Sequence, residues 1–153
     1  MQCTVGFELY RGQQQWIAEP FGFPGITQGE TMAEACESAA DLVRETMLDM
    51  AMHGEEIPRP VLDAPLSHGG ERLLVSVEAS LDSVAKVSAA QAARMLGVSR
   101  PRITALLKNG RLDGWTEGRN TWVTLDSVQA RLDEIVKPGR PKAEQPQERA
   151  ALG

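Results

Sequence analysis

The stretch AAQAARMLGVSRPRITALLKNG, residues 89–110, decides how the second half of this chain folds. Ser88 and Ser99 each precede a run in which apolar residues recur at helical spacing, and serine is a preferred residue at the start of a helix. Gly97 separates the two runs and marks a turn. Pro101 lies in the first turn of the second run, where its missing N–H costs little. We therefore predict two short helices joined by a tight turn.

The residues that follow predict a small hairpin and one more helix. The segment WTEGRNTW (115–122) has turn residues at Glu117–Asn120 between its two tryptophans. We expect these tryptophans in the core of the hairpin rather than stacked on nucleic-acid bases. Thr124 or Asp126 then starts the last helix. The inner face of the second helix is expected to carry Ile103, Leu106 and Leu107, and the last helix contains Val128, Leu132 and Ile135.

Charged residues are unevenly distributed in this chain of 153 residues, whose net charge is −5. Residues 1–84 contain 4 Lys/Arg and 14 Asp/Glu, whereas residues 85–142 contain 11 Lys/Arg and 5 Asp/Glu. The remaining residues, 143–153, have a net charge of −1. Such an asymmetry points to a half that faces nucleic acid, and the alternative is two ordinary solvated surfaces. Because the sign changes at a predicted domain boundary, we favour the first interpretation.

The basic residues stand where a DNA-binding helix would present them. In a helix-turn-helix motif the second helix enters the major groove, and its N-terminal residues meet the base edges. Arg100 and Arg102 occupy that position, and a guanidinium can make two parallel hydrogen bonds to guanine. The other basic residues would bind phosphates. The alternative is that these arginines only solvate a helical core. The predicted DNA-binding residues are Ser99, Arg100, Arg102, Thr104, Lys108, Arg111 and Arg119.

The first half of the chain predicts a small sheet packed against one helix. Alternating apolar residues indicate strands at 2–9 and 14–19, with a short strand at 26–28. TMAE (31–34) fits a capping box, and the helix that it begins has one apolar stripe. After a connection rich in proline and glycine, a strand follows at 73–79. The predicted fold class is α+β with the order β-β-β-α-β, and the last strand is expected to lie parallel to an earlier one.

The second half resembles the winged helix-turn-helix domains of the excisionase and MerR-like group. The residues that carry the resemblance are VSAAQAARMLGVSRPRITALLKNGRLDGWTEGRNTWVTLDSVQARL (87–132), and AARMLGVSRPRI is the most specific part. The resemblance implies binding to double-stranded DNA, with the hairpin near Arg119 as the wing. It implies no particular target sequence.

Residues 16–60 resemble the HicB-type antitoxin family. The resemblance rests on FPGITQGETMAEACESAADLV (23–43) and GEEIPRP (54–60). It implies a partial ribonuclease-H-like fold for the N-terminal domain. It also implies that this domain binds and blocks a HicA-like toxin, a small basic ribonuclease. Many such antitoxins carry a C-terminal DNA-binding domain and repress their own operon.

These observations divide the chain into a toxin-binding domain at 1–84, a DNA-binding domain at 85–137 and a disordered tail at 138–153. An acidic domain suits a toxin whose RNA-binding face is cationic. The candidate toxin contacts are Glu8, Glu19, Phe21 and Phe23, although the phenylalanines fit a core role equally well. A two-fold operator would require a homodimer or a higher even oligomer.

Two other interpretations stay open. A metal-dependent nuclease needs several converging carboxylates, and the strands offer Glu8, Glu19 and Glu78. His53 and His68 have no acid or nucleophile at a catalytic spacing, so we expect no enzymatic activity, no metal and no cofactor. The second alternative is a solitary HicB-like transcription regulator without a toxin, whose N-terminal domain dimerises or senses a ligand.

The composition indicates a cytoplasmic protein that does not enter a membrane. No apolar run approaches the roughly 18 residues of a membrane-spanning helix. The segment MQCTVGFELYRG (1–12) lacks the basic start and apolar middle of a signal peptide. Cys3 and Cys36 form no CxxC pair, and we expect both to be reduced thiols.

Overall fold

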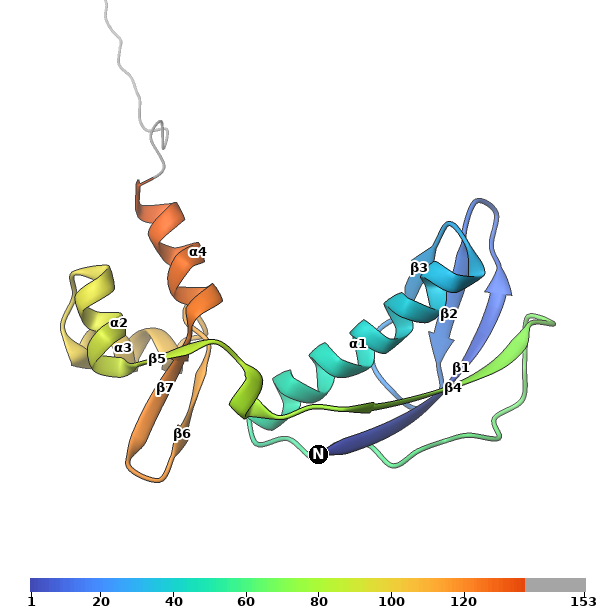
Figure 1. Ribbon diagram of the computed structural model, residues 1–153, viewed down its shortest axis with the longest axis horizontal. Helices are drawn as coiled ribbons and strands as arrows, with labels where there is room; N and C mark the ends of the chain where they lie inside the picture. Colours follow the sequence, from blue (N-terminus) through green and yellow to red (C-terminus); the bar gives the residue numbers. More distant parts are fainter. Residues whose placement is uncertain (137–153) are drawn as a thin grey trace, which may run out of the picture. The chain divides into compact units, whose positions relative to one another are not determined.

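The computed structural model describes residues 1–136, so the disordered tail predicted at 138–153 lies outside the described residues. The chain divides into two compact units between Val84 and Ala85, close to the point where the balance of charge changes. The described residues form two antiparallel sheets and four α-helices (Figure 1). The predicted α+β class is therefore confirmed. Each unit is described by itself below.

The first unit is a four-stranded antiparallel sheet with one long helix across it. Its sheet has the order β3-β2-β1-β4, so β3 and β4 are the two edges. Figure 1 shows the helix lying along one face. The elements are β1 (Gln2–Arg11), β2 (Trp16–Pro20), β3 (Thr27–Gly29), α1 (Met32–Met52), β4 (Glu71–Glu78) and the 3-10 helix η1 (Leu81–Ser83).

The direction of β4 differs from the prediction, because β4 runs antiparallel to β1. Gly29, at the end of β3, and Glu71, at the start of β4, both lie at the Arg11 end of β1. Helix α1 carries the chain away from that end, and the connection 53–70 carries it back. The expectation of a parallel strand assumed that the helix alone was the crossover. A second traverse of the sheet reverses the strand direction.

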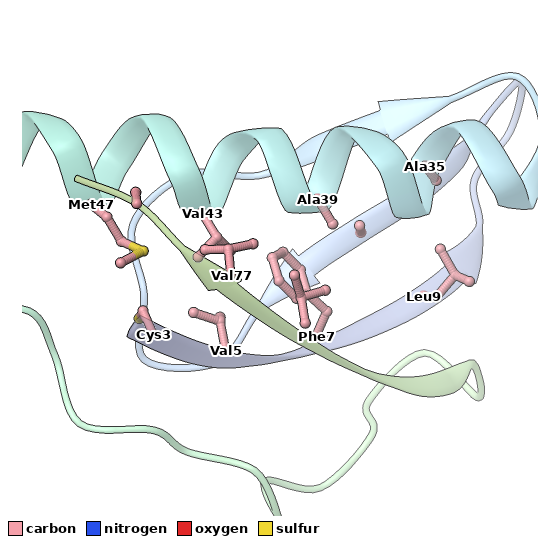
Figure 2. Close-up of a cluster of buried hydrophobic side chains, with 12 residues drawn as sticks. Cys3, Val5, Phe7, Leu9, Ala35, Ala39, Val43, Met47 and Val77 are labelled. Carbon is pink, nitrogen blue, oxygen red and sulfur yellow. The ribbon is translucent and has the colours of Figure 1, made fainter. Parts of the chain in front are cut away.

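The core of the first unit forms where the alternation of β1 meets the four-residue spacing of α1. Every second side chain of β1 faces the helix. The side chains of α1 that face the sheet are small at one end of the helix and larger at the other (Figure 2). Ala35 and Ala39 bring the helix backbone close to the sheet, while Val43 and Met47 fill the wider end. All four of these helix residues are fully buried. Facing them are Cys3, Val5, Phe7, Leu9, Ala18, Val75 and Val77.

Helix α1 begins at the residue that the sequence indicated. Thr31 is the N-cap, and its hydroxyl accepts a hydrogen bond from the Glu34 N–H at 3.1 Å. The Glu34 carboxylate reaches back to the N–H of Glu30 rather than to that of Thr31, which shifts the predicted capping box by one residue. Gly54 follows the helix with a φ of 70° and ends it.

The second unit packs three helices against a small three-stranded sheet of order β5-β7-β6. The predicted hairpin is confirmed as β6 and β7, with its turn at Gly118. Strand β5 was not predicted, because three residues carry too little alternation to be recognised. The elements are β5 (Lys86–Ser88), α2 (Ala89–Leu96), α3 (Arg100–Lys108), β6 (Gly114–Glu117), β7 (Asn120–Thr124) and α4 (Leu125–Val136).

The second unit has its own hydrophobic core. Ile103 and Leu106 of α3 are buried, and Leu107 packs against the same cluster, as the inner face of the predicted helix requires. Val128 of α4 is fully buried. Ile135 is 55 % exposed, so the apolar stripe of α4 ends one turn earlier than its sequence spacing indicates. The other members of this core are Ala89, Ala92, Ala93, Leu96, Leu112 and Val123.

Candidate nucleic-acid interface

Capping interactions hold α2 and α3 at a fixed turn. Ser88 and Gln91 form a complete capping box at the start of α2, which was not predicted from the sequence. At the other end of α2, Gly97 adopts a φ of 67°. The N–H of Val98 donates to the carbonyl of Ala93, and the N–H of Gly97 donates to the carbonyl of Arg94. This pair of bonds is a Schellman motif. It ends α2 sharply and leaves only Val98 and Ser99 before α3.

Helix α3 turns its basic residues outward. Ser99 caps the helix by accepting a hydrogen bond from the N–H of Arg102 at 3.3 Å. Arg100, Arg102, Thr104 and Lys108 are all exposed, while Ile103 and Leu106 of the same helix are buried in the core. No ion pair within residues 1–136 engages either arginine. The first turn of α3 therefore presents two unneutralised guanidinium groups beside a helix N-terminus, which itself favours anions.

The β6–β7 hairpin presents a third cation at its tip. Gly118 has a φ of 62°, as a tight two-residue turn requires, and Arg119 beside it is exposed. Trp115 and Trp122 face each other across the hairpin, and the ammonium of Lys86 lies 5.9 Å and 5.4 Å from their ring centres. Trp115 is buried, and Trp122 lies in the cross-strand pair with it. Both tryptophans thus stiffen the hairpin, as expected.

Arg111 lies in different surroundings from the other predicted DNA-binding residues. It follows α3, is exposed, and lines a shallow hollow of about 380 Å³ together with Arg131, Glu134 and Ile135 of α4. Its neighbours therefore belong to the last helix rather than to the first turn of α3.

Glu8, a predicted toxin contact, lies in the interior of the first unit. Its side chain is on the sheet face opposite α1 and is only 1 % exposed. The carboxylate accepts backbone hydrogen bonds from Ser67 at 3.0 Å, His68 at 2.8 Å and Gly70 at 3.0 Å. The His68 ring adds a fourth at 3.2 Å. Because Glu8 fastens the end of the 53–70 connection to the sheet, the sequence-based assignment of Glu8 to a surface contact is wrong.

The hydrogen bonds to Glu8 decide its protonation. Burial by itself raises the pKa of this carboxyl, but the N–H groups of Gly70, His68 and Ser67 and the His68 side chain together lower the pKa to about 2. A carboxylate with four donors is satisfied without any external partner. No feature of the sequence alone indicated this site, because Glu8 and its partners lie about 60 residues apart.

Glu19 and Tyr10 extend this polar cluster along the same face. The Tyr10 hydroxyl donates to Glu19 at 2.8 Å, and the Tyr10 ring stacks on His68 with 3.9 Å between ring centres. The pKa of Tyr10 is raised to about 12. Burial is the largest cause, and the hydrogen bond to Glu19 and the negative charges of Glu19 and Glu8 add to it. Glu19 is half-buried, so its carboxylate is only partly open to a partner.

The two phenylalanines have different roles. Phe23 packs against the core of the first unit, which is the structural alternative considered for it. Phe21 lies on the outer face, where its backbone N–H bonds to the carbonyl of Gly6 and the Arg72 guanidinium lies 5.6 Å from its ring centre. Neither ring stands free on the surface, since both are only partly exposed.

A row of exposed negative charges in the first unit lies on α1. Its outward-facing carboxylates were not among the toxin contacts predicted from the sequence. Asp41 pairs with Arg44 at 3.1 Å and Asp49 lies 3.4 Å from His53, both at exposed positions. The exposed acidic residues along the helix are Glu34, Glu37, Asp41, Glu45 and Asp49, and Glu30 precedes it.

Three further features bear on the class of protein. Cys3 is buried and Cys36 partly buried, both as free thiols, and burial raises the pKa of Cys3. Among residues 1–136 no three His, Cys, Asp or Glu side chains gather as a metal site would require. In the same part of the chain no helix is both long and apolar enough to cross a membrane.

Comparison with protein families, curated proteins and solved structures finds no match for this chain.

Proposed function

We propose that this chain is an antitoxin of a type II toxin-antitoxin system. In this proposal residues 85–137 form a winged helix-turn-helix that represses the chain's own operon. Residues 1–84 form a partial ribonuclease-H-like domain that neutralises a HicA-like ribonuclease toxin. The protein acts in the cytoplasm, as a homodimer or higher even oligomer, and has no enzymatic activity of its own.

The observation that carries the DNA-binding part is the first turn of α3. Arg100 and Arg102 are exposed in the first turn of a helix that Ile103 and Leu106 anchor to the core. Such a helix can enter a major groove without losing its core contacts, and its arginines can read guanine edges. Arg119 at the hairpin tip suits a phosphate or minor-groove contact of a wing.

Charge supports the toxin-binding part. A ribonuclease needs a cationic surface for phosphates, and the exposed carboxylates of α1 complement such a surface and would accelerate association. We assign the toxin contact to this row of carboxylates in place of Glu8. The proposal gives Glu8 no catalytic role, because its carboxylate already holds four hydrogen bonds within its own chain.

The DNA-binding part is tested by replacing one arginine of α3. Arg102→Ala should weaken binding to the DNA upstream of the chain's own gene by about 10- to 100-fold, because a bidentate base contact contributes about 1–3 kcal/mol. Fluorescence anisotropy with operator and scrambled duplexes would measure the loss. Arg59→Ala, which removes an exposed arginine of the first unit, is the matched control and should leave binding unchanged. Equal affinity of Arg102→Ala and the parent chain would contradict the assignment of α3.

A solitary regulator without a toxin is the second candidate, favoured if the first unit serves only for dimerisation or ligand sensing. The two candidates differ in one observation. A small basic protein encoded beside this chain should co-purify with it if the antitoxin proposal is correct. Charge reversal on α1, Glu37→Lys with Asp41→Lys, should then release that protein. Asp63→Lys, at an exposed position in the 53–70 connection, serves as the control.

A further inference from the structure

The two edges of the first sheet are protected to different degrees. Strand β3 has only three residues, and a very short edge strand offers few groups for pairing. Strand β4 has eight, and among the described residues no other strand pairs with its outer edge. Its register with β1 is continuous from Glu78 to Glu71, so it contains no bulge, and it has neither proline nor lysine. Bulges, prolines and lysines are among the features by which monomeric proteins block an edge, and β4 has none of them. Its charged residues are Glu71, Arg72 and Glu78.

The hydrogen bonds at the end of the ladder show which groups β4 leaves open. Met1 and Ala79 exchange two bonds of 2.9 Å each, which makes them a hydrogen-bonded pair. Pairs of this kind alternate along an antiparallel ladder, so Val77, Val75, Leu73 and Glu71 also point their backbone groups at β1. The N–H and C=O groups that point away from β1 belong to Arg72, Leu74, Ser76 and Glu78.

We propose that β4 pairs antiparallel with β4 of a second copy of this chain, about a two-fold axis at Val75. Only registers that join outward-pointing residues to each other can form hydrogen bonds. Of these, the register centred on Val75 uses the whole strand. It places Arg72 opposite Glu78 of the second copy and Leu74 opposite Ser76, each twice by symmetry. About eight backbone hydrogen bonds would join the two sheets into one of eight strands.

The side chains on the outer face fit this register. Opposite charges directly across a strand pair stabilise it, whereas like charges destabilise it. Centring the axis on Val75 gives two Arg–Glu pairs and no like-charge pair among the outward residues. Leu74 is 53 % exposed in the single chain and would lie opposite Ser76 of the second copy. Arg72 donates one N–H to the carbonyl of Leu62 and keeps four others for Glu78.

This interface deepens the proposed function, because it supplies the two-fold assembly that an operator would require. It does not depend on DNA or toxin binding. Failure of the interface would leave the binding of both ligands to single chains intact, whereas failure of the proposed function would leave the assembly intact. Measuring mass and ligand binding on the same variants therefore separates the two.

The first experiment replaces an outward N–H. Leu74→Pro in the full chain removes an N–H that β1 does not use, so the sheet should survive, as circular dichroism would verify. Light scattering after gel filtration should show an assembly for the parent chain and half its mass for Leu74→Pro. Leu74→Ala keeps the N–H and should keep the assembly. A monomeric parent chain, or a folded Leu74→Pro variant of unchanged mass, would overturn the proposal.

The second experiment tests the register by charge and remains decisive if Leu74→Pro does not fold. Glu78→Arg places two arginines opposite each other and should weaken the assembly by about tenfold or more in Kd. Adding Arg72→Glu should restore most of that loss. Glu55→Arg, at an exposed position in the 53–70 connection, should change nothing. An unaffected Glu78→Arg variant, or no recovery in the double variant, would overturn the Val75-centred pairing.

Discussion

Glu8 shows how one buried charge can fix a long connection. Four donors of the 67–70 segment converge on its carboxylate, and in return that segment is held on the sheet. A charged group in the interior is tolerated only when it is hydrogen-bonded on this scale. The first consequence of this arrangement is a pH dependence of stability.

The pKa of Glu8 is about 2 in the folded chain, against an ordinary value of 4.5. The unfolded chain therefore binds the proton more readily, and the stabilisation is complete above about pH 4.5 and lost as the pH falls towards 2. Glu8→Gln should lower stability at neutral pH and flatten this dependence. Urea denaturation at several pH values would measure it, with Trp16 fluorescence reporting on the first unit after Trp115→Phe and Trp122→Phe. The exposed Glu55→Gln should keep the parent profile.

Gly6 is required for a different reason, which is space. A Cβ at this position would lie 2.7 Å from the carbonyl oxygen of Val61, where the 53–70 connection crosses the outer face. Gly6→Ala should therefore cost about 1–3 kcal/mol, as overpacking usually does. Thr4→Ala, on the same face, removes only an exposed hydrogen bond with Ser76 and should cost less than about 1 kcal/mol. The same urea assay compares them, and equal losses would contradict the close approach at Gly6.

At the scale of elements, the turn between α2 and α3 depends on the backbone of one residue. Gly97 has a φ of 67°, and no neighbouring atom would touch an added Cβ. Gly97→Ala therefore tests conformation alone and should destabilise the second unit by about 1–2 kcal/mol. Asparagine tolerates this conformation better, so Gly97→Asn should cost clearly less. Hydrogen exchange of the α2 and α3 amides would resolve the effect, and identical losses in both variants would contradict it.

Most elements could be predicted because their signals are local. The spacing of apolar residues in α1, the serines before α2 and α3, and the glycine of the β6–β7 turn all act over a few residues. Strand β5 could not be found in this way. Its three residues become a strand only because β7 lies beside them, with Val87 opposite Val123.

At the scale of the whole molecule, two units with separate cores and opposite charge suggest separable activities. Residues 1–84 have their own buried cluster, which should let them fold without the rest of the chain. We predict that this fragment alone neutralises the partner toxin, because the exposed carboxylates of α1 remain. Co-expression with the toxin and a growth assay would measure neutralisation. A fragment that is folded by circular dichroism yet fails to protect would contradict the antitoxin proposal.

The sequence by itself determined most of the helices and strands, the residues at which α1, α2 and α3 begin, and the apolar face of α1 and α3. It also placed the arginines of α3 on an outward face, because caps and periodicity depend on neighbours three or four positions away. The tertiary structure alone decided that β4 runs antiparallel to β1 and that Glu8 is internal. Both depend on the path by which the 53–70 connection returns along the sheet. Contacts between residues some 60 positions apart leave no periodic trace in a sequence, so only the folded chain could reveal them.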